Sequence, residues 1–293
     1  MEDLREESLS GKAYILGIKV YVLFCRTIET PNLSVNPIAI VLVIVLLMES
    51  LFPHPFIDQR QEFFLKHGYR FVRSIREHPF IGLFSLVTRR EQPVLVVIKA
   101  DFNVDREHDA IVRLLSLAPT APVTRIAGPI IRDQAPYESF YHGLSYLVMN
   151  YIPGVPLITL ASLKQRDPVV VRRFITMLHK ITDLLATTGL HHGDLNFGNI
   201  LTNDDLETFV LIDFEYAEVH DNPRRRAYAV WVDIVDMVKQ LYGPKSSRPQ
   251  AIRSYIAELR DRDFNEEMTS FELSEDVNAC RCLIDLVKQD LLG

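Results

Sequence analysis

The sequence predicts an α+β protein of two lobes, a small lobe rich in β-strands followed by a larger helical lobe. Short β-branched runs dominate residues 69–151, and apolar residues at helical spacing dominate the chain after Pro153-Gly154. We expect an extension at residues 1–60 and a domain at 61–293, with the small lobe at 61–149, a hinge at 150–153 and the large lobe at 154–293. The space between two lobes is a natural ligand site.

Composition and charge narrow the class of protein. The 293 residues are 48% hydrophobic and 24% charged, which is ordinary for a globular protein and excludes a disordered one. A net charge of −6 excludes sequence-blind binding to nucleic acid. Cys25, Cys280 and Cys282 have no metal-ligand spacing and are expected to be unpaired thiols, the last two on different sides of a helix.

An apolar segment stands out in the extension. No charged residue occurs from Thr30 to Met48, and Pro37 to Met48 is almost purely aliphatic. A membrane-spanning helix needs about 20 apolar residues, and the first third of this segment is diluted by polar residues. It begins too late for a secretory signal and lacks a small-residue cleavage site. Three interpretations stay open: a single anchor helix at 30–48, a buried element, or an error in the gene model.

The small lobe is expected to hold five strands and one helix. Four of the strands are apolar or β-branched runs bounded by turns, at 69–74, 80–88, 126–131 and 144–151. The fifth, Pro93 to Lys99, reads as a buried strand with one charge at its end. Between them, residues 105–117 place Ile111, Leu114 and Leu115 on one helical face.

Helices are expected to make up the large lobe. Asp167-Pro168 is an N-cap followed by proline at the first helical position, and Gly189 supplies a stop. Trp231 opens a further apolar helical run, and residues 249–259 and 274–292 have helical patterns.

A polar loop between helix and strand carries the chemistry. It runs from His191 to Leu201, and a strand ending in Asp213 follows it. Phosphoryl transfer requires a positioned nucleophile and neutralisation of phosphate charge by metal. An Asp and an Asn five residues apart can divide these tasks, Asp194 facing the acceptor hydroxyl and Asn199 facing a metal. Asp213 completes an oxygen-rich Mg²⁺ site.

This loop resembles that of the protein-kinase-like superfamily. His192 to Asn199 fits the pattern H-x-D-x-x-x-x-N, and Ile212-Asp213-Phe214 resembles the start of the D-F-G motif. Gly193 in place of arginine, and Glu215-Tyr216 in place of glycine, look more like aminoglycoside phosphotransferases and choline kinases. The resemblance covers residues 65–240 and implies a bilobal protein-kinase-like fold that uses ATP and Mg²⁺. It makes Asp194 the catalytic base, His192 the brace of the loop, and Asn199 and Asp213 the metal ligands.

The same resemblance assigns residues to nucleotide binding. Val96-Val97-Ile98-Lys99 is similar to the V-A-I-K strand whose lysine holds the α- and β-phosphates. Glu107 is the expected ion-pair partner of Lys99, with Asp109 as the rival. Backbone groups near Asn150 and Ile152 would meet the adenine edge.

One aspartate further along the chain has two interpretations. Asp233 resembles the kinase aspartate that accepts hydrogen bonds from the catalytic loop. An ordinary position on a helix face is the alternative, and Asp236 competes for the role.

The acceptor is less closely specified. There is no G-x-G-x-x-G before Lys99, no A-P-E after Asp213, and only 18 residues from Asp213 to Trp231. So short a link hardly forms a platform for a peptide, which favours a small-molecule hydroxyl as acceptor. A small atypical Ser/Thr protein kinase is the alternative enzyme, and a pseudokinase scaffold the alternative of another class. Because the site must meet ATP, we expect a cytoplasmic kinase domain, with a membrane partner only through residues 30–48.

Overall fold

The computed structural model describes nine stretches of the chain. They are residue 57 and residues 60–75, 80–87, 93–101, 104–133, 144–157, 167–242, 248–260 and 270–293. Their contacts divide them into two compact units, one formed by residues up to Val104 with Ala127–Tyr151, the other by Asp105–Ile126 with Ile152–Gly293. The chain passes between the units three times, after Val104, after Ile126 and after Tyr151. The role of residues 150–153 as a hinge stays a prediction.

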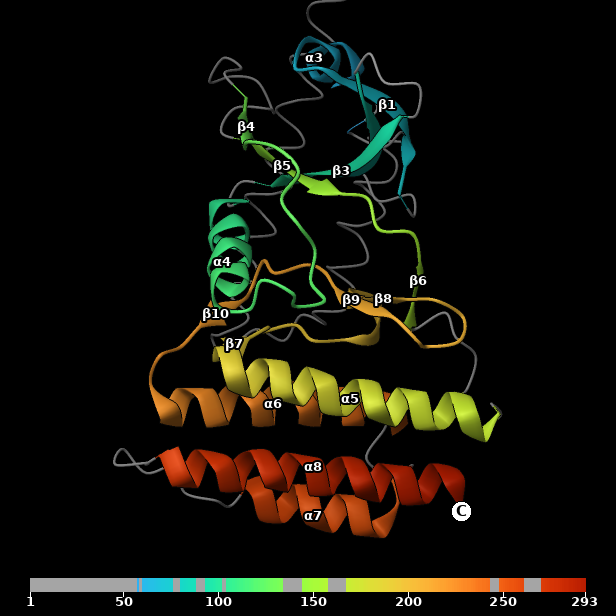
Figure 1. The fold of residues 1–293 in the computed structure, drawn as a ribbon, viewed down its shortest axis with the longest axis vertical. Coiled ribbons are helices and arrows are strands. Elements are labelled where there is room, and N and C mark those ends of the chain that lie inside the picture. The colour runs from blue at the N-terminus through green and yellow to red at the C-terminus, as the bar shows by residue number, and fades with distance from the viewer. Residues whose placement is uncertain are drawn as a thin grey trace, which may run out of the picture. The chain divides into compact units, whose positions relative to one another are not determined.

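The first unit is a five-stranded antiparallel sheet with one short helix. The strands lie in the order β1-β2-β3-β5-β4 (Figure 1). Their bounds are β1 (Tyr69–Ser74), β2 (Ile81–Leu86), β3 (Val94–Asp101), β4 (Ile131–Arg132) and β5 (Ser145–Asn150), and α3 (Gln61–Lys66) precedes them. Four of the five strand predictions match these elements to within two residues at each end.

Aromatic side chains form the core of this unit. Phe64 of α3 meets Phe84 of β2 and Tyr146 of β5 edge to face, with ring centroids 4.7 and 4.9 Å apart. All three rings are fully buried, and edge-to-face pairs add to the gain from burying their area. Arg60 forms an ion pair with Asp133, which pins the start of α3 to the end of β4.

One predicted strand, at residues 126–131, is wrong. Only Ile131–Arg132 pairs with β5, although Ala127 N–H donates to the Val148 carbonyl at 2.9 Å. Gly128 and Pro129 occupy the middle of the run, and proline has no N–H to offer a sheet. The apolar run is therefore mostly irregular chain.

The second unit is helical with two small sheets. Its helices are α4 (Val104–Leu117, all but the first residue), α5 (Pro168–Thr188), α6 (Pro223–Tyr242), α7 (Gln250–Arg260) and α8 (Ser270–Leu292). Helices α5, α6 and α8 pack on one another, and α7 packs on α8 (Figure 1). One sheet pairs β7 (Leu190–His191) with β10 (Glu218–Val219). The other has the order β6-β8-β9, from β6 (Val155–Pro156), β8 (Ile200–Thr202) and β9 (Phe209–Leu211).

Helix α6 begins eight residues earlier than the apolar run at Trp231 predicts. Its first turn contains Pro223, and the Asn222 side chain accepts a hydrogen bond from Arg225 N–H at 3.2 Å. This is the same cap-and-proline signal that correctly predicts the start of α5. The three arginines at 224–226 thus belong to a helix and not to the link before it.

Two sequence predictions concern the cysteines of α8 and a possible membrane-spanning helix. Cys280 is buried and Cys282 is exposed, as their spacing on a helix predicts. Within the described stretches, no helix combines the length and apolar composition needed to cross a membrane. Residues 30–48 lie outside those stretches.

Candidate active site

The loop that carries Asp194 lies between β7 and β8 and turns sharply at Gly193. Gly193 has φ +78°, and a Cβ there would lie 2.6 Å from the Tyr216 carbonyl oxygen. Both the backbone conformation and the close approach require glycine. The structure thus gives a physical reason for glycine where most protein kinases have arginine.

Asn199 holds Asp194 through two hydrogen bonds. Its Nδ2 donates to Asp194 Oδ2 at 3.1 Å and to the Asp194 carbonyl at 2.9 Å. Because the amide nitrogen makes both bonds, the amide oxygen is the atom left for a cation. Asp194 as a whole is exposed.

Asn196 shapes the same loop and was missed from the sequence. Its Oδ1 accepts hydrogen bonds from Gly198 N–H and Asn199 N–H, at 2.7 and 3.2 Å, and so caps the short 3₁₀ helix Phe197–Asn199. An asparagine just before a tight turn is a recognisable capping signal. Gln240 of α6, whose Oε1 accepts from Phe197 N–H at 3.1 Å, has no comparable signal because it lies 43 positions away.

Asp213 follows β9 and is connected to the loop through the backbone. Ile212 N–H donates to the Asn199 carbonyl at 3.0 Å. Asp213 itself has φ +66°, in the left-handed region that non-glycine residues seldom occupy. The structure therefore places Asp194, Asn199 and Asp213 on two adjoining segments of one unit, as the sequence predicts.

His192 lies buried behind these residues. Its Nε2 donates to the Ile212 carbonyl at 3.1 Å, and its ring lies 4.9 Å from the Phe214 ring, between centroids. Burial lowers the pKa of His192 to about 4, so the ring is neutral at physiological pH. A neutral, buried imidazole that holds a backbone carbonyl braces the loop and does not transfer protons in this position.

Asp233 of α6 supports the loop from the helical side. Its Oδ2 accepts from His192 N–H at 2.8 Å and its Oδ1 from Gly193 N–H at 3.3 Å. Burial raises the pKa of Asp233 to about 7, although the two N–H donors act to lower it. Asp236 instead pairs with Lys239 at 2.6 Å, so the interpretation that assigns the loop to Asp233 is confirmed.

Glu107 of α4 reaches the residue after Asp213. Its Oε1 accepts from Phe214 N–H at 3.0 Å, and the side chain is buried. Asp109, the rival, has an 82% exposed side chain beside His108.

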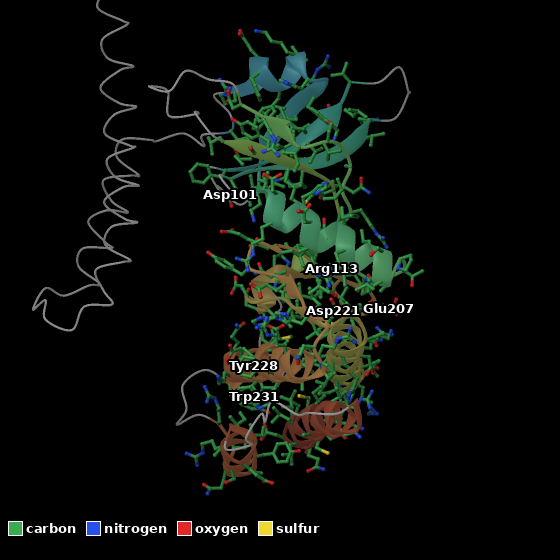
Figure 2. The ribbon with its side chains drawn as sticks, turned by 90° about the vertical axis from the view of Figure 1, so that its left-hand side faces the viewer. Asp101, Arg113, Glu207, Asp221, Tyr228 and Trp231 are labelled. Carbon is green, nitrogen blue, oxygen red and sulfur yellow. The ribbon has the colours of Figure 1, made fainter. Side chains whose placement is uncertain are left out.

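Ion pairs on the surface also join α4 to the segment after Asp213. Arg106 meets Glu218 at 2.7 Å. Arg113 meets Asp221 at 2.8 Å, and both of these residues are labelled in Figure 2. Helix α4 is thus tied to this segment at three points along its length, of which the Glu107 contact is the buried one.

The predicted nucleotide-binding residues are divided between the two units. Lys99 is a buried residue of β3, paired in register with Ile81 and Leu147, and Asn150 is the exposed last residue of β5. Ile152 and Glu107 belong to the second unit. The pairing of Lys99 with Glu107 and the roles of Asn150 and Ile152 in binding ATP stay predictions.

The oxygen donors fit a magnesium ion held together with phosphates. Within the described stretches, no three His, Cys, Asp or Glu side chains converge on a metal-sized site. Mg²⁺ is usually held by only one or two carboxylates, with phosphate oxygens and waters completing the octahedron. The assignment of Asp213 and Asn199 as the ligands of such a site stays a prediction.

Comparison with known proteins supports a kinase-like domain. Residues 139–240, about a third of the chain, match the ABC1 atypical kinase-like domain, which is part of the protein-kinase-like superfamily. The matched residues include Asp194, Asn199, Asp213 and Asp233 but neither Lys99 nor Glu107. No curated protein matches this chain. The match indicates a kinase-like function that uses ATP, and the closer likeness to aminoglycoside phosphotransferases and choline kinases stays a hypothesis.

Proposed function

We propose that this chain is a phosphotransferase that moves the γ-phosphate of ATP to the hydroxyl of a small molecule. The observation that carries the proposal is the joining of Asp194 to Asn199, with Asp213 on the adjoining segment. A catalytic base and two oxygen donors for Mg²⁺ are the minimum that this reaction asks of a protein.

Each residue has a separate part in the reaction. Oδ1 of Asp194 would accept the proton of the acceptor hydroxyl as its oxygen bonds to the γ-phosphorus, and the bond from phosphorus to the bridging β,γ-oxygen would break, leaving ADP. Asn199 fixes the other oxygen of Asp194, so that the base keeps one orientation. Bound Mg²⁺ would neutralise phosphate charge, and Asp213 and Asn199 would hold it.

The segment after Asp213 supports a small acceptor. Only residues 214–222 lie between Asp213 and α6. Ala217 N–H closes a turn on the Phe214 carbonyl at 3.0 Å, and Glu218–Val219 pairs with β7. Arg106 also donates to the Tyr216 carbonyl at 3.4 Å. Because the segment is short and its backbone is already hydrogen-bonded within the protein, little of it is left to bind an extended peptide.

A second candidate is an atypical protein kinase. The observation in its favour is the match of residues 139–240 to an atypical kinase-like domain. The chemistry at Asp194 would be the same, and only the acceptor would differ.

Two substitutions separate binding from catalysis. Asp213→Asn should abolish Mg²⁺-dependent binding of ATP, because a carboxylate ligand becomes a neutral amide. Asp194→Asn should leave ATP binding nearly unchanged and lower turnover by about 10²–10⁴, the usual worth of a general base. ATP binding is measured by titration calorimetry with and without Mg²⁺, and turnover as ADP release.

Asp109→Asn is the matched control, because it also removes one carboxylate, at an exposed site on α4. The control should bind and turn over ATP like the unmodified protein. If Asp194→Asn also turned over ATP like the unmodified protein, Asp194 would not be the base. ATP binding without any turnover in the unmodified protein would indicate a pseudokinase.

A further inference from the structure

Helix α6 offers two hydrogen-bond acceptors to the loop that carries Asp194. Asp233 is the first, and it holds the start of the loop through two backbone N–H groups. Gln240 is the second, and its Oε1 accepts from Phe197 N–H at 3.1 Å, near the end of the loop. The two acceptors are about two helical turns apart, so they lie on the same face of α6. Asp194 therefore lies between two points that the same helix holds.

The contact with Gln240 completes the hydrogen bonding at the start of the 3₁₀ helix Phe197–Asn199. The first N–H groups of a helix have no acceptor within the helix itself. Asn196 Oδ1 accepts from the second and the third residue of this helix, at 2.7 and 3.2 Å. Gln240 supplies the acceptor for the first. Without Gln240, the Phe197 N–H would have to turn to water.

This short helix positions the residue that fixes Asp194. Asn199 is its last residue, and the Asn199 amide donates to both the carboxylate and the carbonyl of Asp194. The ring of Phe197, at the other end, packs edge to face on Phe174 of α5, with centroids 6.1 Å apart. A shift of the short helix would therefore displace Asn199 and, with it, the carboxylate of Asp194.

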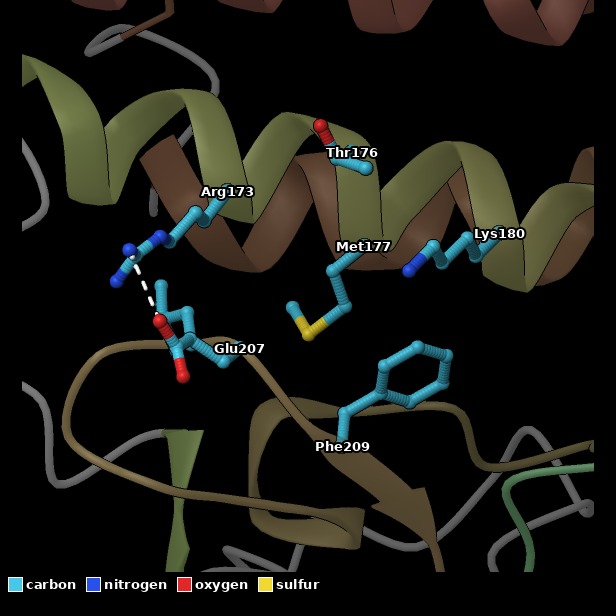
Figure 3. A pocket seen from close by; sticks show the side chains of 7 residues that line it. Arg173, Thr176, Met177, Lys180, Glu207 and Phe209 are labelled. Carbon is cyan, nitrogen blue, oxygen red and sulfur yellow. Dashed lines mark ion pairs between the residues drawn. The ribbon is translucent and has the colours of Figure 1, made fainter.

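The chain beyond Asn199 is held by α5 and does not need Gln240. Strand β8 follows Asn199 directly, and the turn from β8 to β9 is joined to α5 by an ion pair of Arg173 with Glu207 at 3.0 Å (Figure 3). Arg173 also donates to the Asp205 carbonyl at 3.2 Å. Loss of the Gln240 contact should therefore disturb the loop locally and leave the fold intact.

We propose that Gln240 is a positioning residue for phosphoryl transfer, which sets the place of Asn199 and, through it, of Asp194. The proposal rests on the proposed function, in which Asn199 binds Mg²⁺ and Asp194 is the base. The Gln240 side chain is exposed, and losing one hydrogen bond at the surface changes the free energy of unfolding only slightly. The effect should therefore be seen in turnover and in the Mg²⁺ requirement.

Gln240→Met and Gln240→Glu are the test variants. Both new side chains are unbranched and have a helix propensity similar to that of glutamine, but only glutamate keeps an oxygen acceptor. Gln240→Met should lower kcat for ADP release about fivefold, the factor that corresponds to the net worth of one hydrogen bond. It should also raise the Mg²⁺ concentration that gives half-maximal turnover, and Gln240→Glu should restore both values.

Gln289→Met is the matched control, because Gln289 is also an exposed glutamine on a helix of the same unit. It should turn over ATP like the unmodified protein, with the same Mg²⁺ requirement. Urea unfolding of all the variants separates positioning from stability. A Gln240→Met protein that was less stable but had a normal Mg²⁺ requirement would have lost only a structural contact, which would overturn the proposal.

Hydrogen exchange of the Phe197 amide measures the contact without any activity. In ¹⁵N-labelled protein this amide should exchange about fivefold faster in Gln240→Met than in the unmodified protein, and at the unmodified rate in Gln240→Glu. Unchanged exchange in Gln240→Met would overturn the proposal, as would unchanged turnover or equal losses of turnover in the two variants. Faster exchange in a protein that has no ATP turnover at all would confirm the contact and overturn the phosphotransferase on which the positioning role rests.

Discussion

Asp213 keeps a left-handed backbone because buried side chains hold the peptide groups on both sides of it. His192 binds the carbonyl of Ile212, and Glu107 binds the N–H of Phe214. A left-handed conformation costs a non-glycine residue roughly 1–2 kcal/mol. The surrounding contacts must offset this cost, and strain held in this way is common at functional sites.

Glu107 should therefore matter to stability through its oxygen atom. Glu107→Ala leaves the buried Phe214 N–H without this acceptor and should lower the free energy of unfolding by about 1–3 kcal/mol. Glu107→Gln keeps an oxygen in the same place and should cost clearly less. Urea unfolding of the two variants and the unmodified protein measures the difference.

Asp109→Ala is the control for removing a carboxylate from α4, and it should change stability by no more than about 0.5 kcal/mol. Glu107→Gln also tests the predicted pair with Lys99, because it removes the charge and preserves the oxygen. A stable Glu107→Gln protein with normal turnover would contradict that pair. Equal destabilisation by glutamine and alanine would contradict the role of the Phe214 hydrogen bond.

Asp233 makes the stability of the loop depend on pH. Its pKa rises from 3.8 to about 7 on folding, so between these values the folded state holds one more proton than the unfolded state. The stability that the folded state gains from the raised pKa of Asp233 is complete below about pH 4 and is lost as the pH rises to about 7. His192 has the opposite effect, because its lowered pKa gives stability that is lost as the pH falls from 6.5 to about 4.

Comparison with Asp233→Asn isolates the aspartate, since His192 is present in both proteins. The stability advantage of the unmodified protein over Asp233→Asn should shrink by a few kcal/mol between about pH 4 and about pH 7. Urea unfolding across this range gives the difference directly. An advantage that stays constant or grows with pH would show that Asp233 is ionised throughout.

The sequence predicts the residues of the site better than their partners. Asp194, Asn199 and Asp213 are recognisable because their spacing is local, within one loop and the next strand. The bonds of Glu107 to Phe214 and of Gln240 to Phe197 join residues 107 and 43 positions apart. Only tertiary packing creates such contacts, so no local sequence pattern predicts them.

At the scale of elements, both ends of α5 were predictable, whereas the start of α6 and the irregular strand at 126–131 were not. Asp167 caps α5 by accepting from Val169 N–H at 2.6 Å, and Gly189 ends the helix with φ +70°. Both signals act over a few residues, and the sequence shows them plainly. The run at 126–131 was mispredicted because its apolar composition outweighed Gly128 and Pro129.

Gly189 should tolerate substitution less well than another glycine of similar backbone conformation. A Cβ at Gly189 would lie 2.1 Å from the His220 carbonyl oxygen, whereas at Gly68, with φ +86°, it would meet nothing within 4 Å. Gly68→Ala should cost only the strain of about 1–2 kcal/mol. Gly189→Ala should cost about 1–3 kcal/mol more, because the His220 backbone must move.

Thermal or urea unfolding of the two alanine variants tests this ranking. If the two variants lost the same free energy of unfolding, the β7–β10 region would adapt to the added methyl group without cost.

At the scale of the whole molecule, strands dominate one compact unit and helices dominate the other. The change of pattern after Pro153-Gly154 lies close to the passage between units at Tyr151 and Ile152. Helix α4 was expected in the small lobe by its place in the chain, but by contacts it belongs to the second unit. Its bonds to Phe214, Glu218 and Asp221 explain this assignment, and sequence order alone does not show it.

The class of acceptor is the prediction that concerns the whole protein. A protein substrate needs a surface on which an extended segment can lie beside Asp194, and the segment 214–222 is short and bound to β7 and α4. A small molecule needs only to bring one hydroxyl to the Asp194 carboxylate. With labelled ATP, a metabolite library should therefore give a phosphorylated product, and a protein extract should not. The product should also be absent when Asp194→Asn replaces the unmodified protein, which separates transfer at this site from contaminating kinases. Stoichiometric labelling of one protein, without a metabolite product, would instead favour the atypical protein kinase.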